Sequence, residues 1–135
     1  RDGESRADVS ARVDDNPAVM QARVPTDDDL AATVRDDMIV PLFYGDCSDG
    51  DIATAKANLV PQASEIVTAK VHLSAANYGS VPRVFIECLK DGAIPIEMQR
   101  QMVAAVLCQR VITMDTSHSP FFSAPKELTE HLLSL

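Results

Sequence analysis

The sequence predicts an α/β protein in which parallel strands alternate with flanking helices. Residues 82–135 carry apolar patterns in the order strand, helix, strand, helix, which is the order of a βαβ unit with a right-handed crossover. Both expected strands are apolar along nearly their whole length, as is typical of strands covered on both faces. Hydrophobic residues make up 46% and charged residues 24% of the 135 residues, which is the composition of one ordinary domain.

The N-terminal part is expected to begin with an irregular segment. Residues 1–25 alternate charged and small side chains without helical or strand periodicity, which predicts a surface arm or loop. A mostly helical region is expected over residues 26–80. Thr26 and Asp29 have the spacing of a capping box, and they predict a short acidic helix that ends at Pro41.

Two further helices are expected in this helical region. Ser48 and Asp51 form a second capping box, which predicts a helix of about three turns that stops at Pro61. Residues 62–73 have the apolar spacing of another helix, and residues 75–82 have the composition of a loop.

The C-terminal part, residues 81–135, is expected to hold the whole βαβ unit. Its strands and helices are predicted, in order, over residues 83–89, 96–107, 110–114 and 125–135. Ser123 is the expected cap of the last helix. Two parallel strands do not make a stable sheet, and residues 1–81 offer no comparable strand. We therefore expect the chain to be the C-terminal part of a larger α/β protein, in which another portion contributes most of the sheet.

Charge and cysteine usage narrow the classes of partner. The net charge is −8, and residues 1–52 hold 13 Asp/Glu against 5 Lys/Arg. The sequence has no basic patch with interleaved aromatic residues, which disfavours nucleic acid, and its apolar stretches are far shorter than the roughly 20 residues of a membrane helix. Cys47, Cys88 and Cys108 lack the spacing of a disulfide framework or a zinc site. We expect a cytoplasmic protein with no metal and no cofactor.

Two polar residues follow the ends of the two predicted strands. Asp91 comes directly after the first strand, and His118 lies in the loop after the second. Ligands of open α/β sheets bind beyond the carboxyl ends of the strands, and neighbouring strands lie about 4.8 Å apart, so these side chains can meet. A carboxylate that accepts the imidazole Nδ1–H gives the acid and base of a hydrolytic triad. The alternative interpretation is an ordinary strand-exit turn beside a loop histidine.

Residues from about 38 onward resemble the cap and C-terminal part of the α/β-hydrolase superfamily. The resemblance is to the branch of plant methylesterases and hydroxynitrile lyases, with bacterial carboxylesterases of the pyrethroid-hydrolase kind. It is carried by LFYGDCSDGDIATAKANLVPQAS, YGSVPRVFIECLKDGAIPIEMQRQM and TSHSPFFSAPKELTEHLLSL. The family's triad acid lies in a strand-exit D-x-x-x-P pattern, which implies Asp91 with Pro95 in place, and its base implies His118. Residues 26–80 would then be a helical cap, or lid.

The chain departs from the family at the nucleophile. No G-x-S-x-G motif is present, and the nearest look-alike, residues 45–50, has its second glycine one residue too late. We interpret that segment as a turn with a helix cap, and capping explains Asp46, Asp49 and Asp51 better than calcium does, because the EF-hand spacing is absent. The resemblance implies a nucleophilic serine on an N-terminal α/β-hydrolase portion and a chain that is inert alone.

One position within this branch separates two chemistries. The lyases carry a lysine directly after the catalytic histidine, whereas the esterases carry an uncharged residue, and here that residue is Ser119. The resemblance therefore implies a serine carboxylesterase for a small apolar ester rather than a hydroxynitrile lyase. Ser119 is expected to border the acyl pocket, and Met38 and Phe43 are expected to bind substrate, with core packing as their alternative role. A non-catalytic receptor on the same scaffold and a homodimer are left open.

Overall fold

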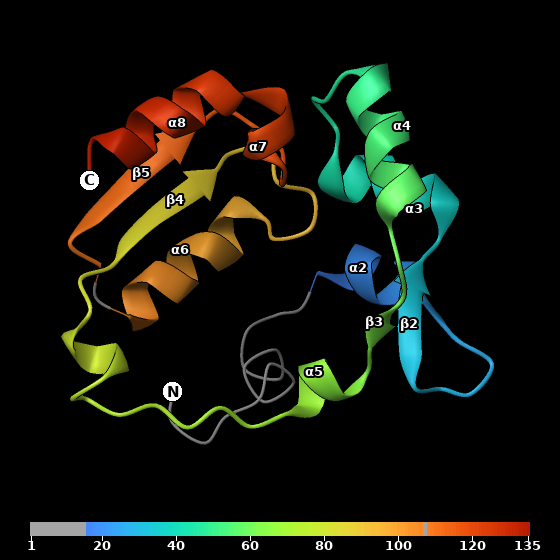
Figure 1. Ribbon diagram of the computed structural model, residues 1–135, viewed down its shortest axis with the longest axis horizontal. Helices are drawn as coiled ribbons and strands as arrows, with labels where there is room; N and C mark the ends of the chain where they lie inside the picture. The colour runs from blue at the N-terminus through green and yellow to red at the C-terminus, as the bar shows by residue number, and fades with distance from the viewer. Residues whose placement is uncertain (1–15, 107) are drawn as a thin grey trace.

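The C-terminal half of the chain forms a parallel pair of strands with helices on both sides. The computed structural model describes residues 16–106 and 108–135. The elements of this half are β4 (Val84–Cys88), α6 (Ile96–Ala105), β5 (Arg110–Met114), α7 (Pro120–Ser123) and α8 (Pro125–Leu133). Strands β4 and β5 pair in parallel, and α6 and α8 lie on opposite sides of them (Figure 1). The predicted α/β class and the βαβ order are confirmed.

The register of the parallel pair places the two strand exits side by side. Val84 pairs with Arg110 at one end, and Cys88 pairs with Met114 at the other. The chain runs on from both strands in the same direction, since the amide of Lys90 donates to the carbonyl of Thr116 at 2.9 Å. The loops that carry the candidate residues therefore leave the same edge of the sheet.

The N-terminal half contains a small antiparallel sheet that is separate from the parallel pair. Its strands are β1 (Arg23–Pro25), β2 (Ala31–Val34) and β3 (Gln62–Ala63), in that spatial order, and helix α2 (Pro17–Ala22) precedes β1. The prediction of an irregular segment over residues 1–25 is wrong for α2 and β1, while residues 1–15 lie outside the described residues. Asn16 caps α2 and Pro17 starts it, but a six-residue helix is too short to show a period.

The predicted acidic helix from Thr26 to Pro41 is also wrong in its first half. Thr26 closes a hairpin turn between β1 and β2, because its Oγ1 accepts the amide of Ala31 at 3.1 Å. Asp29 takes a positive φ of 57° in that turn, which a helix excludes. Helix α3 (Asp36–Phe43) begins only after β2, and it contains Pro41 rather than ending there.

The helix after the second capping box forms as predicted. Helix α4 (Asp49–Asn58) is capped by Ser48, whose Oγ accepts the amide of Asp51 at 3.2 Å and donates to its carboxylate at 2.6 Å. The helix predicted over residues 62–73 is wrong. Its first residues pair with β2 as strand β3, and only α5 (Glu65–Thr68) is helical; a 3-10 turn, η1 (Tyr78–Ser80), follows later.

The predicted cap of the last helix is a further correction. Ser123 is the last residue of α7, where its amide donates to the carbonyl of Ser119, and Ala124 takes the cap position of α8. Pro125 then starts α8, because its fixed φ suits a first helical position without a side-chain cap.

A cluster of buried apolar side chains joins the two halves of the chain. Ala22 of α2, Leu42 of α3 and Ala93 of the turn after β4 form a buried cluster. Met38, Phe43 and Ile94 are among the partly buried side chains packed against it. The turn after β4 is therefore fixed by helices from the first half of the chain. No helix in the described part of the chain has the length and apolar character needed to cross a bilayer.

Candidate active site

Asp91 and His118 meet where the two parallel strands end. The imidazole Nδ1 of His118 lies 3.0 Å from Oδ1 and 2.9 Å from Oδ2 of Asp91. The Asp91 side chain is 7% exposed and that of His118 is 33% exposed, so the contact is shielded from water on the acid's side. The structure thus brings together the two residues that the strand exits singled out. Because Nδ1 is engaged by the carboxylate, Nε2 is the ring nitrogen that can exchange a proton with a ligand.

The acid turn, which we define as residues 88–94, aims the carboxylate of Asp91. Oδ1 of Asp91 accepts the amides of Ala93 and Ile94, each at 2.8 Å. A side chain that folds back onto the amides two and three residues ahead loses its rotational freedom. The carboxylate is therefore oriented by its own backbone before it contacts the imidazole.

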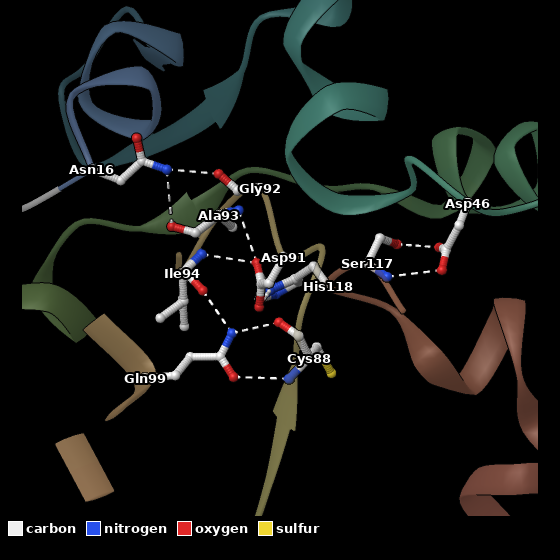
Figure 2. A network of polar contacts seen from close by, with 10 residues as sticks. All are labelled: Asn16, Asp46, Cys88, Asp91, Gly92, Ala93, Ile94, Gln99, Ser117 and His118. Atoms are coloured by element: carbon white, nitrogen blue, oxygen red, sulfur yellow. Dashed lines mark hydrogen bonds and ion pairs between the residues drawn. The ribbon is translucent and has the colours of Figure 1, made fainter. Parts of the chain in front are cut away.

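Asn16, helix α3 and Gln99 contact the acid turn from outside, and Figure 2 shows the contacts of Asn16 and Gln99. Asn16 donates from Nδ2 to the carbonyl of Gly92 at 2.6 Å and to that of Ala93 at 3.3 Å. Helix α3 packs so closely that a Cβ built on Gly92 would lie 2.3 Å from the carbonyl oxygen of Pro41. Gln99 of α6 bonds the backbone of the turn at its first and last residues. The turn is thus held on several sides.

The histidine loop is tied to the segment between α3 and α4. The Asp46 carboxylate accepts hydrogen bonds from the amide of Ser117, at 2.8 Å, and from the hydroxyl of Ser117 (Figure 2). Burial raises the pKa of the Asp46 carboxyl, but the hydrogen bonds that the carboxylate accepts, those from Ser117 foremost, together outweigh burial and place the pKa below its usual range. This carboxylate therefore anchors the residue that directly precedes His118.

The three predicted substrate-binding residues lie in different surroundings. The ring of Phe43 stands edge-on to the imidazole of His118, with ring centroids 5.3 Å apart and planes at 72°. Met38 packs against the buried cluster of Ala22, Leu42 and Ala93. Ser119 is buried with 1% exposure. Of these three, Phe43 has a ring contact with the candidate base, and Ser119 follows that base directly in the chain.

A hollow of about 280 Å³ opens beside the pair. Asp91 and His118 line it together with Cys88 and Gln99. Its apolar walls come from β4, α6, α7 and α8 and include Phe85, Ile86, Met102, Phe121 and Leu128. The arrangement can bind an apolar group next to an oriented imidazole. In the described part of the chain, no cluster of three His, Cys, Asp or Glu side chains is placed to hold a metal ion.

Sequence reasoning missed the three polar residues that hold the two loops. The partners of Asn16 and Asp46 lie more than 70 residues away along the chain, so no local pattern reveals them. Gln99 did leave a signal in the sequence, because it falls among the apolar positions of α6. The structure buries it, with 3% of the residue exposed. A polar side chain on the buried face of a helix needs a hydrogen-bond partner there.

The fold and this pair define the C-terminal core of an α/β-hydrolase, and the comparisons agree. No family model matches the chain. A chloroplastic protein of Arabidopsis thaliana that carries the name methylesterase 11 is 35% identical over 112 residues, which cover 82% of this chain and 28% of that protein. Methylesterase 1 of the same plant is 43% identical over 65 residues, which cover 47% of this chain and 25% of its length.

A solved structure extends the likeness to almost the whole fold. A pyrethroid hydrolase from Sphingobium faniae superposes with a TM-score of 0.82 at 21% identity, over 98% of this chain and 55% of that one. The chain belongs to the α/β-hydrolase superfamily, in its plant methylesterase-like branch. It spans about a quarter of the length of the curated relatives given above.

Proposed function

We propose that this chain supplies the acid and base of a serine carboxylesterase, with Asp91 as the acid and His118 as the base. The contact between His118 Nδ1 and Asp91 carries the proposal, because it fixes the tautomer in which Nε2 accepts a proton. The methylesterase names of the relatives support ester hydrolysis as the reaction. The cytoplasmic location stays a prediction, since one relative is described as chloroplastic.

The nucleophile in this proposal lies on an N-terminal α/β-hydrolase portion, and we call that portion together with this chain the assembled protein. Two observations support it. The parallel sheet has only two strands in the described residues, and the aligned part covers only about a quarter of the length of these relatives. Exposed apolar side chains such as Val111 and Leu89 fit a surface that further elements cover. The chain alone is then inert.

The reaction runs as two acyl transfers. The serine hydroxyl attacks the ester carbonyl while Nε2 of His118 takes its proton, and the resulting imidazolium is stabilised by Asp91. His118 returns that proton to the leaving alcohol, which yields an acyl-serine. Water then attacks the acyl group as His118 accepts its proton, and the proton returns to the serine as the carboxylic acid leaves.

The substrate we propose is a small, largely apolar ester. The apolar walls of the hollow beside His118 and the ring of Phe43 support this class. Ser119 carries no charge and is buried, which supports ester hydrolysis over cyanohydrin cleavage, where a cation is needed at that position. In the assembled protein, Ser119 is proposed to border the acyl pocket, and Met38 is proposed to bind substrate together with Phe43.

Hydrolysis of p-nitrophenyl acetate by the assembled protein tests the proposal. His118→Ala and Asp91→Asn should each lower kcat by about 1,000-fold or more, because each removes a triad member. Matched controls are His131→Ala on α8 and Asp49→Asn, an exposed aspartate at the first residue of α4; both should keep the activity. Full activity in His118→Ala would refute the proposal, and saturable ligand binding by a protein without hydrolysis would favour a receptor.

A further inference from the structure

Gln99 forms a clamp on the acid turn. Its Oε1 accepts the amide of Cys88 at 2.9 Å, and its Nε2 donates to the carbonyl of Cys88 at 2.9 Å and to that of Ile94 at 2.8 Å. The side chain extends from α6, and the residue is 3% exposed. One amide thus closes the turn by bonding its first and last residues (Figure 2).

The clamp occupies the outer edge of β4. Leu89 donates its amide inward to Met114 of β5, whereas the amide and carbonyl of Cys88 both bond to Gln99. A side-chain amide that offers one acceptor and one donor to a single residue imitates a neighbouring strand. The backbone of Cys88 therefore has its partners in this chain without another strand at this point, and Cys88 and Gln99 both line the hollow beside the candidate pair.

We infer that Gln99 is a positioning residue for the acid, an inference that rests on the proposed function. The side-chain hydrogen bonds of Gln99 all go to backbone atoms of Cys88 and Ile94 and not to Asp91, so Gln99 acts through the backbone at both ends of the turn. Without the amide, one N–H and two carbonyls in a buried place lose partners, and the turn relaxes to satisfy them. A displacement of about 1 Å at a reacting group lowers a rate on the order of 100-fold.

The clamp requires an amide and not a carboxylate of the same shape. Nε2 faces two carbonyl oxygens, and Gln99→Glu would set a second oxygen against both. Gln99→Met keeps the length of the side chain and removes every hydrogen bond. Gln101→Glu makes the same change of charge at an exposed site on the same helix and is the matched control.

The test compares kcat and KM for p-nitrophenyl acetate in the assembled protein. Gln99→Glu and Gln99→Met should lower kcat by about 10- to 100-fold and change KM less than about threefold, whereas Gln101→Glu should change neither. The Nδ1 proton resonance of His118 should shift or broaden in both Gln99 variants and stay unchanged in the control, which a role in stability alone would not produce. Thermal unfolding shows which variants are folded at the assay temperature.

Two outcomes separate the failure of this inference from that of the proposed function. If His118→Ala abolishes hydrolysis while both folded Gln99 variants keep the kcat and the Nδ1 resonance of the parent, Gln99 does not position the acid. If His118→Ala keeps full activity, the proposed function itself fails.

Discussion

Gly92 is the position at which a single added methyl group should disturb both the fold and the acid. A Cβ at this residue would lie 2.3 Å from the carbonyl oxygen of Pro41, and 3.1 Å and 3.2 Å from Cα and the carbonyl oxygen of Leu42. All three are backbone atoms of α3, which cannot rotate away as the end of a side chain can. Relief to ordinary contact requires a shift of about 1 Å in the acid turn or in α3, a distance that matters at a reacting group.

The expected cost of Gly92→Ala follows from that shift. Overpacking of this kind lowers the free energy of unfolding by about 1–3 kcal/mol. The same movement displaces the neighbouring Asp91, so kcat for ester hydrolysis by the assembled protein should fall by about 10- to 100-fold.

Thermal unfolding and hydrolysis of p-nitrophenyl acetate measure the two effects of Gly92→Ala. Gly50→Ala is the matched control, because it lies in α4 and its Cβ would meet only Ser48 Oγ at 3.8 Å. That control should be neutral or stabilising by up to about 1 kcal/mol. An unchanged Tm and kcat in Gly92→Ala would show that α3 does not fix the acid turn.

Two further substitutions probe the contacts that hold the loops. Asn16→Ala removes the cap of α2 and the hydrogen bonds to the acid turn, so thermal or urea unfolding should show a free energy of unfolding lower by about 1–3 kcal/mol. The control Asn58→Ala loses only a local hydrogen bond and should lower the free energy of unfolding by less. Asp46→Asn weakens the anchor of Ser117 and should lower kcat by about 3- to 10-fold, whereas Asp49→Asn should not. Because the pKa of Asp46 is lowered in the folded state, its ionised carboxylate stabilises the fold at pH values above the usual carboxyl pKa, and this stabilisation is lost as the pH falls through the folded pKa. Asp46→Asn should therefore have a lower unfolding free energy than the parent near neutral pH, and this difference should vanish in acid when unfolding is followed against pH. A difference that persists in acid would contradict an anchor based on charge.

The elements that sequence predicted correctly are those whose signals are local. Strand β5 begins and ends as predicted, and β4 and α6 fall within their predicted ranges, because apolar periodicity and flanking Pro and Gly mark them. The contact of Asp91 with His118 was also within reach, since the exits of two adjacent parallel strands share one edge of the sheet.

The elements that sequence missed depend on distant partners. Strands β1, β2 and β3 are two to four residues long, and they are strands only because they pair with one another. The capping pattern at Thr26 fits a hairpin turn as well as a helix, and only the pairing of β1 with β2 decides between them. The polar contacts of Asn16 and Asp46 likewise join backbone and side chains that the sequence leaves far apart.

Mapping the residue that a fluorophosphonate probe labels is the most direct test of the proposed acid and base pair. In the assembled protein, mass spectrometry should find the probe on one serine of the N-terminal portion, and labelling should be lost in His118→Ala, which keeps that serine but removes its base. Labelling that persists at the same rate in His118→Ala, or that falls on a serine within residues 1–135 of this chain, would contradict the account.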